Sequence, residues 1–333
     1  MAFLVINLLN SIILRWKLTQ LFACVCLLAT AHIQAQEPVR AHSEVLGTNA
    51  PFSFPEKVAV GRNNDIYFLD TTLSSIFVQD FKNGNVQTLC GAQAIRSPSD
   101  MSVDSRDQLW VLNHNGSKIS KLTRQCAVSA GITLPNLSLR IGTNTFGEVI
   151  VLYETGPSLF ALFSPQGKLL RSFGERIKYQ EEVATNELSD GHIAPDNEGG
   201  FFFSFNYPPL IRHYSRTGRL LNEFKPESDI QIAPPDITVR SVGNAVSINS
   251  KYQILVLDMA ADSRGRLYLL ISGKNKVPAL NEGTRKLVVA TSKGQVLRTL
   301  TLAHSFHRVV AGNGNLYLLR NRPPLRLDRY EVF

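Results

Sequence analysis

The sequence predicts an all-β fold, a single six-bladed β-propeller of four-stranded antiparallel blades, on three observations. A buried-strand pattern recurs six times along the 333 residues. Each copy follows a turn that carries Gly, Asn or Asp, and further short apolar runs flank it, which gives four strands per unit. The composition, 44% hydrophobic and 19% charged, is that of a globular protein.

The recurring pattern marks the second strand of each blade. Its six copies are residues 65–69, 108–112, 148–152, 200–204, 266–270 and 315–319. A first strand precedes each turn and a third strand follows. A fourth strand comes after another glycine turn, most clearly in residues 164–171, 215–222 and 292–298. Four strands in each of six units form the repeat of a propeller.

The last unit ends after its third strand, residues 325–333, and this leaves a bare sheet edge. Residues 38–46 precede the first blade and have no partner of their own. We therefore expect this N-terminal strand to close the ring as the outer strand of the last blade.

The N-terminal residues predict export. An apolar run, 18–31, follows Arg15 and Lys17, is shorter than a bilayer-spanning helix, and precedes a small residue, Ala35. We expect a signal peptide over 1–35, cleavage after Ala35, and one propeller domain over 36–333 that is secreted or periplasmic. A second apolar run, 3–14, leaves an uncleaved anchor as the alternative. In the mature chain we expect no stable membrane span.

Cysteine usage and charge add two expectations. Only Cys90 and Cys126 remain after the signal peptide, and an even pair in an exported chain predicts one disulfide. Two unrelated buried thiols are the alternative. The formal net charge is +8, but the basic side chains are scattered among acids along the sequence. This distribution favours solubility and predicts no nucleic-acid partner.

Two units resemble a known repeat. Residues 54–72 combine a proline, an apolar strand, a glycine turn, an aromatic strand and a closing Asp, and residues 97–113 follow the same order less closely. This pattern resembles the NHL-type repeat of six-bladed, TolB-like propellers. Because such propellers serve both as binding modules and as enzymes, the resemblance implies a shape more than an activity.

The loops predict which face carries function. If the strands run from the centre outward, first-to-second and third-to-fourth turns lie on one face, the short-turn face. Blade-to-blade links and second-to-third loops lie on the opposite one, the looped face. Long insertions, 174–190, 225–251 and 273–285, fall only on the looped face. Functional residues usually collect on loops of a rigid scaffold. Neutral insertion drift is the alternative.

Two loops on the looped face share an Asn-x-Pro-Pro-Leu pattern, residues 206–210 and 321–325. The prolines preset an extended bend. We take Tyr207 and Arg322 as candidate ligand contacts, with a purely loop-shaping role as the alternative.

Counting back nine positions from the first apolar residue of each second strand gives the residue that enters each innermost strand. In blade order these are Lys57, Asp100, Arg140, His192, Asp258 and His307. Two positions later stand the small residues expected where six inner strands crowd together: Ala59, Ser102, Gly142, Ala194, Ala260 and Val309. The sequence therefore predicts a ring of chargeable side chains at the channel mouth on the looped face.

The ring has three interpretations. In the first, Lys57, Asp100 and Arg140 neutralise one another while Asp258 orients the histidines. In the second, His192, Asp258 and His307 form a facial triad for a divalent metal, Zn²⁺ or Fe²⁺. In the third, Lys57, Arg140 and the histidines hold a small anionic ligand.

Two classes of function follow. The favoured one is an exported recognition module that binds a protein, peptide, glycan or small ligand on the looped face. The alternative is a metal-dependent lyase or hydrolase at the channel mouth. The sequence contains no phosphate-binding glycine loop, nucleophile elbow or zinc-type Cys spacing, so it assigns no reaction.

Overall fold

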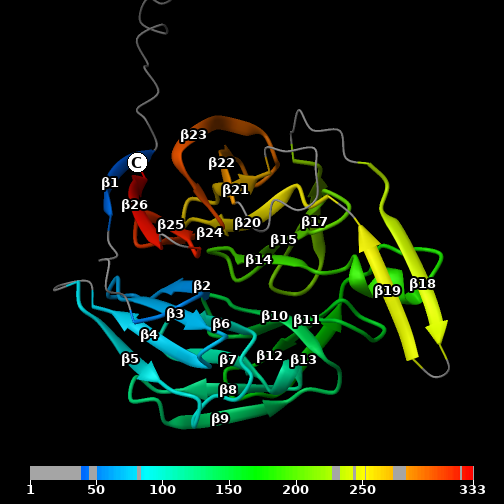
Figure 1. Cartoon of the computed structure of the whole chain (residues 1–333), viewed down its shortest axis with the longest axis horizontal. Coiled ribbons are helices and arrows are strands. Elements are labelled where there is room, and N and C mark those ends of the chain that lie inside the picture. The colour runs from blue at the N-terminus through cyan, green and yellow to red at the C-terminus, as the bar shows by residue number, and fades with distance from the viewer. Residues whose placement is uncertain are drawn as a thin grey trace, which may run out of the picture. The chain divides into compact units, whose positions relative to one another are not determined.

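The computed structural model describes residues 39–44, 51–80, 84–226, 233–242, 245–251, 253–272, 283–322 and 325–332. The predicted signal peptide, 1–35, lies outside these residues. The ring of blades belongs to one compact unit, Ala41–Tyr330 (Figure 1). Among the described residues no helix is long and apolar enough to cross a membrane.

Six four-stranded sheets follow one another around the ring, as predicted. Blade one contains β2 (Pro55–Val60), β3 (Ile66–Asp70), β4 (Ser75–Gln79) and β5 (Val86–Cys90). Blade two contains β6 (Asp100–Val103), β7 (Leu109–Asn113), β8 (Lys118–Leu122) and β9 (Val128–Thr133). Blade three contains β10 (Ser138–Thr143), β11 (Val149–Tyr153), β12 (Phe160–Phe163) and β13 (Leu169–Phe173).

The second half repeats this order. Blade four contains β14 (Gly191–Pro195), β15 (Phe201–Phe205), β16 (Ile211–Tyr214) and β17 (Leu220–Phe224). Blade five contains β20 (Val256–Ala261), β21 (Leu267–Ile271), β22 (Thr284–Ala290) and β23 (Val296–Phe306). Blade six contains β24 (Arg308–Gly312), β25 (Asn315–Arg320) and β26 (Arg326–Val332), and its outer strand is β1 (Val39–Glu44). The N-terminal strand therefore closes the ring, as the unfinished last blade predicts.

Few elements lie outside the blades in the described residues. They are a 3-10 turn, η1 (His114–Gly116), one helix, α2 (Glu182–Glu187), and a separate hairpin of β18 (Asp236–Val242) and β19 (Ala245–Lys251). Both α2 and the hairpin belong to blade-to-blade links and so to the looped face.

The core lies between neighbouring blades. The second strands β3, β7, β11, β15 and β21 are buried along their whole length, because both faces of each inner sheet are covered. Between blades three and four this core is aromatic: Phe160 packs edge-to-face on Phe201 and Phe203 with ring centroids 5.0 Å apart.

The short-turn face is built from one repeated turn. An Asp or Asn opens the first-to-second turn in four blades, at Asp104, Asn144, Asp196 and Asp262. In each, Oδ1 accepts backbone N–H bonds from the residues two and four positions on, at 2.7–3.0 Å. These side chains satisfy the turn's donors and explain why it stays short.

The predicted disulfide is confirmed. Cys90, at the end of β5, is bonded to Cys126 in the β8–β9 turn, with Cα atoms 5.4 Å apart. It therefore ties the outer strand of blade one to the outer part of blade two.

Candidate functional site

Strand register places five of the six sequence-predicted ring residues at equivalent positions. Lys57, Asp100, Arg140 and Asp258 stand opposite Leu69, Leu112, Leu152 and Leu270, and His192 stands opposite Ser204. Each lies in the first half of an innermost strand, on the looped side of the channel.

The sixth position corrects the sequence prediction. Register pairs Arg308, not His307, with Leu319. The β24–β25 turn is one residue shorter than the others, so counting back without gaps selects the wrong neighbour. His307 is buried, and its ring lies against Gly283 of blade five: a Cβ built on that glycine would come 3.0 Å from His307 Cε1.

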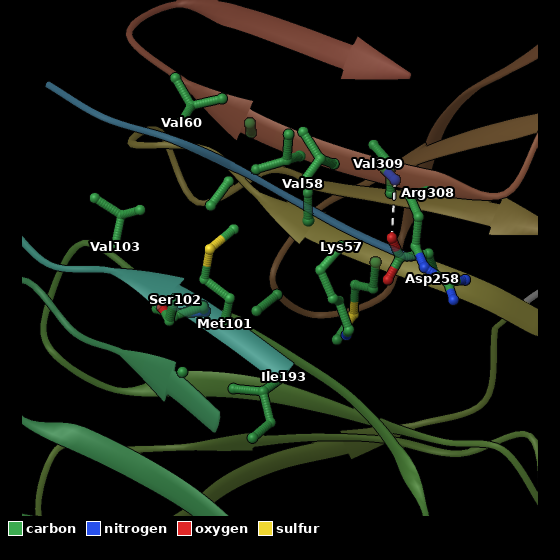
Figure 2. Close-up of a pocket in the computed structure, with 18 of the residues that line it drawn as sticks. Lys57, Val58, Val60, Met101, Ser102, Val103, Ile193, Asp258, Arg308 and Val309 are labelled. Atoms are coloured by element: carbon green, nitrogen blue, oxygen red, sulfur yellow. Dashed lines mark hydrogen bonds between the residues drawn. The ribbon is translucent and has the colours of Figure 1, made fainter. Parts of the chain in front are cut away.

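The inner strands of all six blades enclose a cavity of about 260 Å³. Lys57, Asp100, Asp258 and Arg308 line it at the ring, and the small residues two positions further along complete its walls: Ala59, Ser102, Gly142, Ala194, Ala260 and Val310. Figure 2 shows Lys57, Asp258 and Arg308 together on one side of this cavity. Charged side chains thus lie at the mouth of the cavity, and small side chains line its walls.

The ring contacts repeat with two-fold pseudo-symmetry between blades one to three and blades four to six. In the first half, Asp100 Oδ1 lies 3.2 Å from Lys57 Nζ. In the second, Asp258 Oδ1 lies 3.1 Å from His192 Nδ1. A buried carboxylate therefore neutralises or orients the preceding ring residue in each half.

The same carboxylates hold the next blade. Asp100 Oδ2 accepts the backbone N–H of Ile141 at 2.8 Å, and Asp258 Oδ2 accepts that of Val309 at 2.8 Å. Figure 2 marks the second of these bonds. Each aspartate thus bridges three consecutive blades, which is a structural role for both.

The arginines complete each half. Arg140 Nε donates to Gly191 O of blade four at 3.3 Å, and Arg308 Nε donates to Glu56 O of blade one at 2.7 Å. Arg140 also pairs with Asp190, whose carboxylate lies 3.0 Å from Nη2. Sequence reasoning missed Asp190 because it belongs to the long insertion before blade four.

Charge states follow from these contacts. Burial lowers the pKa of His192, and the positive charges of Lys57 and Arg140 lower it further, against the opposing effect of Asp258. The His192 ring is therefore neutral at neutral pH. Burial alone raises the pKa of Asp258, but the contacts with His192 and the charge of Arg308 outweigh it and bring the pKa to about 2.

Arg140 remains a full cation in the ring. Burial lowers the pKa of Arg140, but the carboxylates of Asp190, Asp100 and Asp258 outweigh burial and raise its pKa above the ordinary value. The ring therefore contains fixed charges of both signs that are matched within the protein.

The looped-face candidates lie apart from this ring. Tyr207, half-buried before a cis peptide bond to Pro208, has its ring centroid 6.3 Å from that of Tyr179, which precedes helix α2. In blade six, the Arg322 guanidinium lies 5.2 Å from the centroid of the Phe54 ring. The structure thus gives Tyr207 an aromatic partner that sequence reasoning did not identify.

Metal ligands do not cluster in the part of the chain that the structure describes: no group of three or more His, Cys, Asp or Glu side chains there could hold an ion. His192 and Asp258 are adjacent, whereas the register separates His307 from their ring.

Comparisons with solved structures show the propeller fold. No family model and no curated protein matches the chain. A putative gluconolactonase has a TM-score of 0.56 at 10% identity and covers 89% of this chain and 93% of its own. Virginiamycin B lyase from Staphylococcus aureus has a TM-score of 0.53 at 13% identity and covers 89% of this chain and 99% of its own. The Myceliophteria thermophila Cps50 (Swd1) β-propeller domain has a TM-score of 0.52 at 9% identity and covers 89% of this chain and 100% of its own. At these identities the likeness extends to the fold alone, and the NHL-type repeat stays a resemblance.

Proposed function

We propose that the protein is an exported recognition module that binds its ligand, a protein, peptide, glycan or small molecule, on the looped face. The observation that carries this proposal is the asymmetry of the two faces. The short-turn face repeats one capped turn, whereas α2, the hairpin β18–β19 and the Tyr179–Tyr207 pair all belong to links and loops of the looped face. Residues that contact a ligand are disproportionately found on loops held by a rigid scaffold.

The ring supports a binding role over a catalytic one. Asp100 and Asp258 each hold a neighbouring side chain and a backbone N–H, and Arg140 holds Asp190. Their polar groups are already used to join blades. Proteins similar in fold include a lyase, a putative gluconolactonase and the propeller domain of Cps50, so the fold does not choose between the classes.

The tyrosine pair is the proposed centre of the contact surface. Tyr179 and Tyr207 are half-buried, so their rings are held in place while one part of each still faces solvent. Tyrosine provides a large contact area at low entropic cost and is enriched at binding hot spots.

A binding screen tests the proposal. The purified protein is applied to peptide and glycan arrays, and the affinity of each hit is measured by biolayer interferometry for the wild type, Tyr207→Ala and Tyr179→Ala. Phe146→Ala, on the short-turn face and 51% exposed, is the matched control. We expect at least a tenfold loss of affinity in the tyrosine variants and none in the control. Hits that depend on Phe146 and not on either tyrosine would overturn the proposal.

The alternative function, a metal-dependent lyase or hydrolase, is favoured only by the His192–Asp258 pair at the channel mouth. A third ligand is needed, and the ring supplies Arg308 at that position. We therefore expect calorimetric titration with Zn²⁺ at pH 7.5 to show no binding tighter than about millimolar. One zinc per chain, lost in His192→Ala, would restore the enzyme interpretation.

A further inference from the structure

The fourth strands of blades three, four and five share a sequence pattern that the looped-face function does not use. Residues 164–171, 215–222 and 292–298 each contain a Ser or Thr turn followed by two apolar residues. In the structure these strands are β13, β17 and β23, the outermost strands of their blades. Their apolar side chains therefore lie at the rim of the ring.

A β-bulge sits at the same place in all three strands. In blade three Phe163 pairs with Leu169 and Leu162 with Arg171, so that Leu170 is left over. The same shift leaves over Leu221 in blade four and Leu297 in blade five. A bulge redirects the extra side chain out of the regular alternation.

The leucines of these bulges face solvent. Leu170, Leu221 and Leu297 are 41%, 43% and 53% exposed, and the preceding Leu169 and Leu220 are 47% and 46% exposed. Large apolar side chains gathered at one place on a surface mark an interaction site more often than single exposed ones do.

Adjacent rims touch one another. Arg171 Nη1 of blade three donates to Thr217 O of blade four at 2.9 Å, and Asn222 Nδ2 of blade four donates to Ser292 O of blade five at 3.4 Å. The outer parts of the three blades that carry the exposed leucines are therefore in direct contact.

Cationic side chains accompany the leucines. Lys168, Arg171, Arg219 and Lys293 are exposed on the same turns and strands. In the described residues none of these four side chains makes an ion pair. Two carboxylates of the same blades pair with other arginines, Glu148 with Arg216 and Glu223 with Arg212. The five leucines and these four cations together are the basic-leucine rim.

We propose that the basic-leucine rim docks the protein on an anionic lipid bilayer. Leucines that enter the interfacial region with Lys and Arg side chains at the headgroup level are the combination that binds anionic membrane surfaces. A second copy of the chain is the less suitable occupant, because two cationic rims would repel each other. Docking at this rim, beside the short-turn face, leaves Tyr207 on the opposite face accessible. The proposal does not depend on the looped-face ligand.

Site-specific fluorescence separates rim docking from any membrane affinity of the N-terminal segment. An environment-sensitive dye is attached at Leu221→Cys in the full chain with Cys24 and Cys26 replaced by Ser, so that no other free thiol takes the dye. Leu73→Cys in the same background, at a position 42% exposed on the looped face, is the matched control. The probe membranes are phosphatidylcholine vesicles with and without 30% phosphatidylglycerol. We expect the rim dye, and not the control dye, to brighten and to be quenched by spin-labelled lipid, only with phosphatidylglycerol.

Substitutions then test the two chemical components. Leu170→Ser/Leu221→Ser/Leu297→Ser, all at exposed positions, should lower vesicle partitioning at least tenfold, and Lys168→Glu/Arg219→Glu should abolish the dependence on phosphatidylglycerol. Leu73→Ser and Tyr207→Ala should leave partitioning unchanged. Equal quenching of both dyes, or binding that does not depend on lipid charge, would overturn the proposal. A dye response that occurs without vesicles and increases with protein concentration would also overturn it, because it would show self-association.

Discussion

The Lys57–Asp100 pair offers the sharpest test of whether the ring is structural. Asp100→Asn preserves an acceptor for Ile141 N but leaves the Lys57 ammonium, 19% exposed, without its partner. Breaking a buried pair in this way costs about 3 kcal/mol of unfolding free energy. Lys57→Met leaves Asp100 with backbone N–H bonds from Ile141 and Met101, so its cost is about 1 kcal/mol.

The double variant removes both charges and should cost only about 2 kcal/mol, which corresponds to a favourable coupling of about 2 kcal/mol. This coupling free energy is measured by urea denaturation of the wild type, both single variants and the double variant at pH 7.5. The pair Arg212–Glu223 is the control: Glu223 is 41% exposed, so its cycle should give about 0.5 kcal/mol. If the changes in unfolding free energy of the Lys57 and Asp100 variants add to within about 0.5 kcal/mol, the pair has no structural role, and Lys57 becomes a ligand-binding candidate again.

Three further predictions concern His192 and Asp258, the disulfide and the closing strand. The pKa values of His192 and Asp258 are both depressed in the folded protein, so both groups stabilise it at neutral pH. The free energy of unfolding should decline as pH falls below about 6.5, because His192 is protonated more readily in the unfolded chain, and by about 2 kcal/mol more between pH 4 and pH 2, because Asp258 is. An unfolding free energy that does not change over this pH range would contradict the prediction. Replacing Cys90 and Cys126 by Ala should cost about 4 kcal/mol in the chain-entropy model, read from urea midpoints against the oxidised wild type. Deleting residues 36–48 removes β1 and should lower the melting temperature or cause aggregation, whereas a monomer that melts like the parent would mean that the blade tolerates its bare edge.

The fold could be predicted from the sequence because each blade repeats the same pattern of apolar strands and turns. Apolar second strands and glycine turns identify the repeats locally, and the unfinished last blade identified β1 as the closing strand. Counting from those strands also located five of the ring positions. It failed at blade six, where a shorter turn puts Arg308 in place of His307.

Other site features could not be read from the sequence because they depend on distant contacts. Asp190 meets Arg140 across 50 residues, and Tyr179 meets Tyr207 from a different loop. Four basic residues that are far apart in the sequence lie along one rim because blades three, four and five repeat the same strand order. Exposure of Leu170 depends on a bulge that no composition or spacing reveals.

The joint between blades six and one has a consequence for biogenesis. Phe52, Phe68 and Phe77 of the first blade share a cluster with Tyr317 and Leu327 of the last. Asn313 Nδ2 also bonds Gly61 O across 252 residues. Contacts of such sequence separation form late, so a growing chain keeps this aromatic surface uncovered until nearly all of it has been synthesised. We therefore expect premature termination by a few dozen residues to leave this aromatic surface exposed and the product prone to aggregation.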